Sequence, residues 1–113
     1  MKLSEFAEIL EKAGLPVTYK AFREGNVPSL PYLVYFESLP SITGTDNQAS
    51  YKIRAVTVEL AFERKDEELE ERIEELWNDH KLFYDVQEEN FIESERLFVK
   101  SMKSIYIEEE RND

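Results

Sequence analysis

The spacing of apolar and polar residues changes in the middle of the chain. Residues 51–62 are rich in β-branched and aromatic side chains, which is typical of a strand. From Asp66 to His80 the apolar residues recur at helical spacing, and they form one stripe: Leu69, Ile73, Leu76 and Trp77. Asp66 has the residue type of a helix N-cap. A strand followed by a helix with one apolar stripe requires a sheet on which that stripe can pack.

The N-terminal third predicts one helix and two strands. Leu3–Ala13 has an amphipathic pattern, and Gly14 followed by Pro16 marks its end. Val17–Phe22 is expected to be a short strand and Leu30–Glu37 a second one, joined by a turn. Apolar residues on both faces of the second strand predict cover on both sides, by a helix on one side and by a partner on the other.

The segment Leu39–Ala49 is polar and rich in turn formers, and it predicts a loop that is long for a hairpin connection. Two interpretations remain open: a surface loop without a role, or a binding loop that contacts a partner. The second interpretation gives the candidate interface residues: Ser41, Thr43, Gly44, Thr45, Asp46, Asn47 and Gln48.

The pattern of the C-terminal third predicts strands. A strand begins at Leu82–Val86, and Gln87–Arg96 either continues it or contains a turn near Glu88–Asn90. Leu97–Ile107 is the last strand, and a change in its inward side near Ser101–Ser104 predicts a bulge or a twist there.

The order of elements is therefore α-β-β-β-α-β-β. Strands in consecutive runs joined by short turns favour antiparallel pairing. We expect an α+β fold with a single, mostly antiparallel sheet and two helices packed on one face. A chain of 113 residues fits a single domain, residues 1–113.

The composition limits the class of partner. The formal net charge of −11 argues against direct binding to nucleic acid or to an anionic membrane, because both attract clusters of Lys and Arg. A hydrophobic content of 42% argues against a disordered acidic tail. The chain has no Cys, which excludes a disulfide framework. Neither a signal-peptide core nor an apolar run long enough to span a bilayer is expected.

The residue types that could catalyse a reaction or bind a metal do not form a recognisable catalytic, metal or cofactor site in the sequence. His80 is the only histidine and is expected to help close the C-terminus of the second helix. The acidic residues of that helix are expected to form a solvated face and do not follow a calcium-loop pattern: Asp66, Glu67, Glu68, Glu70, Glu71, Glu74 and Glu75. We therefore expect a protein that is not an enzyme and uses no cofactor.

Several segments together resemble a known family. An N-terminal helix ends at Gly-Leu-Pro-Val, and the strand PYLVYF and a polar segment follow. Lys65, Asp66, Glu68, Leu69 and Glu70 match a helix-start pattern, and the later matches are Phe83, Tyr84 and Ile92–Glu95. The chain thereby resembles the small tail-terminator or tail-completion proteins (minor tail, head-tail joining) of long-tailed phages and prophages of Gram-positive bacteria.

This resemblance implies a structural protein of the virion tail, present in the cytoplasm of the bacterial host during assembly. It implies self-association into a ring of about six copies at the head-proximal end of the tail. The partners would be the tail tube and the head connector, without direct contact to nucleic acid or membrane.

The glutamate-rich helix supports a different class as the alternative. In that interpretation the chain is a small acidic binding or inhibitor protein, of the immunity or nucleic-acid-mimic kind, that binds a basic partner.

Overall fold

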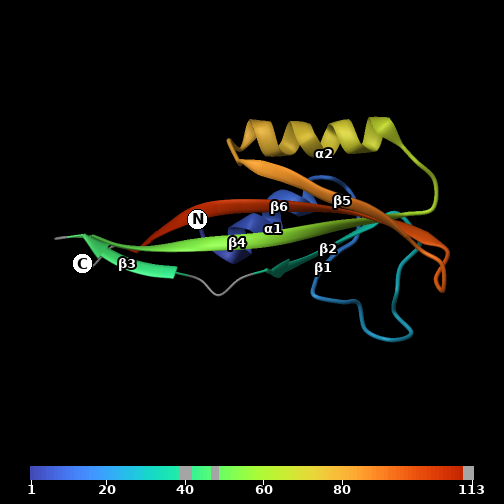
Figure 1. Cartoon of the computed structure of the whole chain (residues 1–113), viewed down its shortest axis with the longest axis horizontal. Helices are drawn as coiled ribbons and strands as arrows, with labels where there is room; N and C mark the ends of the chain where they lie inside the picture. Colours follow the sequence, from blue (N-terminus) through green and yellow to red (C-terminus); the bar gives the residue numbers. More distant parts are fainter. Residues whose placement is uncertain (39–41, 47–48, 111–113) are drawn as a thin grey trace.

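The computed structural model describes the backbone of residues 1–38, 42–46 and 49–110, and the side chains of residues 1–38 and 52–107. These residues form two helices and six strands. In chain order they are α1 (Leu3–Glu11), β1 (Val17–Tyr19), β2 (Tyr32–Glu37), β3 (Ile42–Asp46), β4 (Ala49–Phe62), α2 (Glu67–Asp79), β5 (Tyr84–Ile92) and β6 (Leu97–Glu110) (Figure 1).

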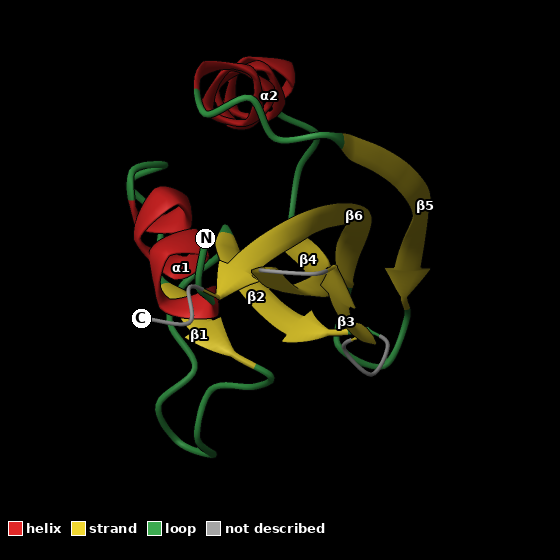
Figure 2. Ribbon diagram, turned by 90° about the vertical axis from the view of Figure 1, so that its left-hand side faces the viewer, coloured by secondary structure: helices red, strands yellow, loops and turns green. Residues whose placement is uncertain are grey.

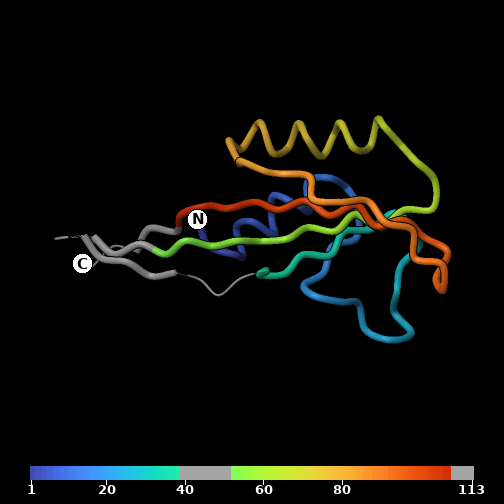
Figure 3. Tube along the Cα trace, in the orientation of Figure 1, coloured from blue at the N-terminus to red at the C-terminus, as the bar shows by residue number. Residues whose placement is uncertain are grey.

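The strands form one sheet in the order β1-β2-β4-β6-β5, and β3 pairs with β4 beside this path. Among the strands of the described residues, β1 and β2 pair in parallel and the other pairs are antiparallel. The predicted α+β class, its succession of elements and its mostly antiparallel sheet are therefore confirmed, with β3 as one further strand. The connection from β1 to β2 lies on the side of the sheet away from α2 (Figure 3).

The core lies between the helices and one face of the sheet, as predicted (Figure 2). Alternate residues of β4 point to this face, and they are Val56, Val58, Leu60 and Phe62. The apolar stripe of α2 packs on them through Leu69, Ile73 and Trp77, and α1 contributes Phe6, Ile9 and Leu10. Side chains at every second position of β4 thus pack against the apolar stripes of α1 and α2, which repeat at helical spacing.

Both ends of α2 are capped by the residues that the sequence predicts. The Leu69 backbone N–H donates a 3.1 Å hydrogen bond to Oδ1 of Asp66, which confirms Asp66 as the N-cap. At the other end His80 is the C-cap, and its Nδ1–H donates to the Leu76 carbonyl over 3.0 Å. The expectation that His80 closes this helix is confirmed.

The prediction of a loop at Leu39–Ala49 is wrong for Ile42–Asp46. These residues form β3, an antiparallel partner of β4 in which Ile42 lies opposite Ile53 and Asp46 opposite Ala49. The hydrogen bonds of this ladder join backbone groups, so the two strands pair without the alternating apolar pattern that marks a strand in a sequence. The candidate residues Thr43, Gly44, Thr45 and Asp46 are therefore on a strand, whereas Ser41, Asn47 and Gln48 lie outside the described residues.

Of the two irregularities predicted for the last strand, a bulge or a twist, the bulge is wrong. The β4–β6 ladder runs without interruption from Ser50 opposite Glu110 to Phe62 opposite Phe98. The irregularity lies on β5, between Val86 and Glu88, opposite the part of β6 where it was expected. β5 is an edge strand with a neighbour on one side only, so an extra residue there disturbs one ladder instead of two.

Candidate interaction surface

The sheet face opposite the helices carries exposed apolar side chains near one end. Ile105 and Ile107 of β6 alternate with the buried core residue Tyr106, and they are 50% and 58% exposed. Their partners on β4 are Ala55 and Ile53. Apolar side chains gathered on a strongly charged chain mark a surface that can be buried by a partner.

These isoleucines flank Tyr106, the last described core residue of β6, and the sheet extends beyond the helices from here. The core cluster uses β4 only from Val56 onward, and in residues 105–110 of β6 it includes Tyr106 alone among the side chains described. Residues 49–55 of β4, β3 and the end of β6 from residue 105 therefore form the margin of the sheet at this end. We call these three segments the arm (Figure 1). The molecule measures 51 × 29 × 22 Å, and the arm contributes to its longest dimension. An ion pair between Arg54 and Glu37 of β2 stands at the base of the arm.

Strand edges are accessible beside the same surface. β5 pairs with β6 only as far as Ser104, so the ladder between these two strands does not cover residues 105–110. β5 is itself an edge strand, and every residue after Tyr84 on it is exposed. Edge strands present backbone N–H and C=O groups that can pair with another chain.

The acidic face of α2 differs from the prediction at one residue. Glu70 is only 9% exposed, and its Oε1 accepts hydrogen bonds from Nζ of Lys100 (2.6 Å) and Nζ of Lys65 (2.9 Å). Lys65 also donates to Glu89 of β5 over 2.8 Å. Lys100 lies on the helix-covered face of β6. A buried ammonium is costly unless it is paired with a carboxylate, and α2 supplies this carboxylate through Glu70. The expectation that Glu70 points into solvent is therefore wrong.

The other glutamates of the helix do form an acidic face. The exposed ones are Glu67, Glu68, Glu71 and Glu75, and Glu74 is partly exposed. Within the described residues, no three His, Cys, Asp or Glu side chains come close enough together to hold a metal ion. The lone imidazole, His80, directs Nε2 at Nζ of Lys12 over 3.1 Å and so links the ends of the two helices.

Comparisons with known proteins give no family for this chain. No protein-family model matches it, and no curated protein matches it significantly. In the described part of the chain, neither helix has both the length and the apolar character of a membrane span.

Proposed function

We propose that this protein is a non-enzymatic structural subunit of a phage or prophage tail, of the terminator or completion type. In this role it forms a ring at the head-proximal end of the tail and joins the tail to the head connector. The resemblance of the sequence motifs to that family motivates the proposal. The observation that supports it best is the arm, which presents exposed Ile105 and Ile107 next to an accessible strand edge.

Ring closure needs two different surfaces on each subunit, because head-to-tail contacts repeat around the axis. The arm supplies one, and the exposed edge strand β5, whose ladder with β6 ends at Ser104 before the arm begins, is a suitable second one. Burial of apolar area contributes about 25 cal/mol per Å² to the free energy of association. Burying Ile105, Ile107 and the neighbouring Ile53 against another subunit would therefore favour ring formation.

The net charge is compatible with this position in a virion. A subunit with a formal charge of −11 gives an acidic ring, and carboxylates facing a central channel repel DNA phosphates. DNA then passes through the channel without being held.

The test is the mass in solution, measured by light scattering over a wide concentration range and joined to negative-stain imaging. We expect a closed ring of about six copies, alone or on addition of tail-tube protein. The double variant Ile105→Lys, Ile107→Lys should remain a monomer with an unchanged unfolding midpoint. Val27→Lys, at a site that is 58% exposed and outside both the arm and β5, is the matched control and should assemble normally. A chain that stays monomeric under all these conditions contradicts the proposal.

The exposed acidic face of α2 favours a second candidate, an acidic inhibitor that binds a basic partner. Glu67, Glu71 and Glu75 point outward at helical spacing, and like charges at i, i+4 cost a few tenths of a kcal/mol each, roughly, in an isolated helix. A basic partner relieves this repulsion. This candidate predicts a one-to-one complex that weakens steeply with salt and survives the two isoleucine substitutions.

A further inference from the structure

The helix-free face of the sheet is hollowed at the end opposite to the arm. The hollow has a volume of about 270 Å³. Its floor includes Val34, Glu59, Ala61 and Val99, which lie side by side on β2, β4 and β6. The connection between β1 and β2 forms one wall, and the β5–β6 turn forms the other. Typical small-molecule pockets measure roughly 300–1,000 Å³, so this cleft fits a side chain of a partner better than a cofactor.

Two carboxylates face this cleft. Glu59 stands in the floor between Val34 and Ser101, its neighbours on the adjacent strands, and Glu95 belongs to the β5–β6 turn. Neither carboxylate has a hydrogen bond or ion pair within the described residues. Lys20 also lines the cleft, but among the described residues no ion pair joins it to either glutamate, and two carboxylates against one ammonium leave the cleft with a net negative charge.

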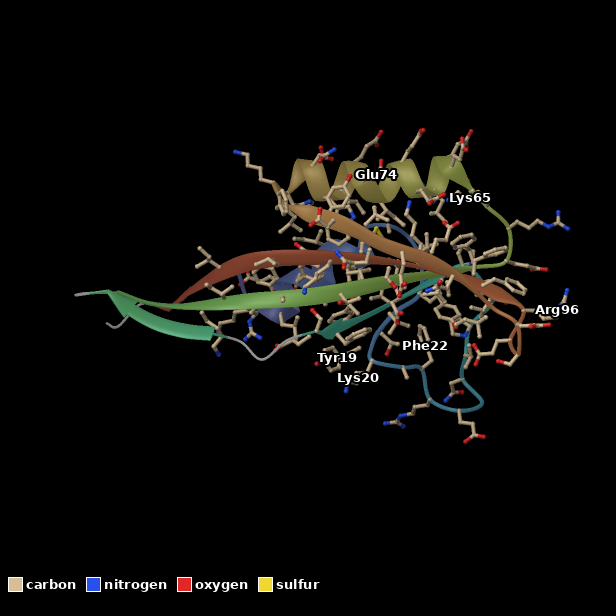
Figure 4. The ribbon with its side chains drawn as sticks, viewed as in Figure 1. Tyr19, Lys20, Phe22, Lys65, Glu74 and Arg96 are labelled. Carbon is tan, nitrogen blue, oxygen red and sulfur yellow. The ribbon has the colours of Figure 1, made fainter. Side chains whose placement is uncertain are left out.

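An aromatic pair stands beside the carboxylates. The rings of Phe22 and Tyr32 meet edge to face, with centroids 5.1 Å apart and planes at 81°. Burial, and then the charges of Glu95 and Glu59, raise the pKa of the Tyr32 hydroxyl, which places this phenol within the field of both acids. Phe22 and Lys20 both lie on the side of the sheet away from α2 (Figure 4).

We propose that this cleft binds an arginine side chain presented by a partner polypeptide. A guanidinium is planar, so it can form paired hydrogen bonds with a carboxylate while one of its faces stacks on an aromatic ring. Its aliphatic stem suits the apolar floor around Glu59. The cleft lies away from the arm, so the inference goes beyond the proposed function and does not depend on ring formation.

The test is an NMR titration of the ¹⁵N-labelled protein with acetylated, amidated Val-Arg-Val. The matched probe replaces arginine with citrulline, which has nearly the same shape and no charge. We expect the arginine peptide to shift the amide signals of Glu59, Ala61 and Glu95, and the citrulline peptide to bind about fivefold more weakly or worse, since one charged contact is worth about 1 kcal/mol.

Three variants locate the site. Glu59→Gln and Glu95→Gln should each weaken binding of the arginine peptide about fivefold, whereas Glu93→Gln, on the same turn but outside the cleft, should leave it unchanged. Dispersed spectra check that each variant is folded. Equal shifts with both peptides, shifts confined to α2, or no shift up to the solubility limit of the arginine peptide each overturn the proposal.

Discussion

Nζ of Lys100 lies 2.6 Å from Oε1 of Glu70, and this contact joins α2 to the middle of the sheet. Both side chains are largely buried, with exposures of 15% and 10%. A second cation, Lys65, reaches the same oxygen from the N-terminal side of the helix. The contact fixes the position of α2 over β6 in a part of the interface that is otherwise apolar.

The first prediction concerns this ion pair. Glu70→Gln should lower the free energy of unfolding by about 1.5–3 kcal/mol, because it leaves the ammonium of Lys100 without its charged partner. Urea unfolding measures the change. The control is Glu71→Gln, an exposed neighbour on the same helix, which should change stability by less than about 0.5 kcal/mol. Equal effects of the two substitutions would contradict the structural role of Glu70.

The second prediction is the pH dependence of the same contact. Burial alone raises the pKa of Glu70, but the hydrogen bonds and charges of Lys100 and Lys65 outweigh it and lower the pKa below its ordinary value of 4.5. A lowered folded-state pKa adds stability above the unfolded pKa, and this stability is lost as the pH falls through the folded value. The stability gap between the wild type and Glu70→Gln should therefore be full at neutral pH and shrink below about pH 4.

Urea titrations at several pH values check this prediction. The comparison between wild type and variant removes the contribution of the other carboxylates, which titrate in both proteins. A gap that stays constant down to the acid limit would show that charge does not cause the effect.

The third prediction concerns the aromatic core. Phe6 is fully buried, and its ring lies 5.6 Å from that of Trp77 and 5.5 Å from that of Tyr106, measured between centroids. Phe6→Ala should cost about 3–5 kcal/mol, because it leaves a cavity between the helices and the sheet. Phe83→Ala removes the same number of atoms from a site that is 70% exposed and should cost much less. The fluorescence of Trp77, which is buried, reports unfolding in both variants.

The fourth prediction is a stabilising change at the end of α2. Lys81 has a φ of 54°, and its N–H donates to the Asn78 carbonyl while the Leu82 N–H donates to the Trp77 carbonyl. This is the Schellman arrangement, which glycine favours at the left-handed position. Lys81→Gly should raise the melting temperature through a gain of about 0.5–1 kcal/mol.

The control for this change is Lys81→Ala, which removes the side chain but keeps the Cβ atom and its strain. It should give no gain. A stabilisation of equal size in both variants would assign the effect to the lost charge instead of the backbone.

The sequence by itself determined the local elements. The stripe on α2, the N-cap at Asp66 and the closure at His80 all follow from residues within a few positions of one another, and the structure confirms them. The positive φ of Gly14, 79°, agrees with the predicted end of α1. The α+β class and the placement of both helices on one face followed because each apolar stripe must be buried.

Only the tertiary structure decided the features that join distant parts of the chain. Three features depend on a partner that local periodicity does not reveal: the parallel pairing of β1 with β2, the strand β3, and the side chain of Glu70, which points toward the sheet. The cleft around Glu59 likewise forms only when β2, β4 and β6 lie side by side. Pairing energy between strands and between charges is non-local, so these features arise when the folded chain brings the partners together.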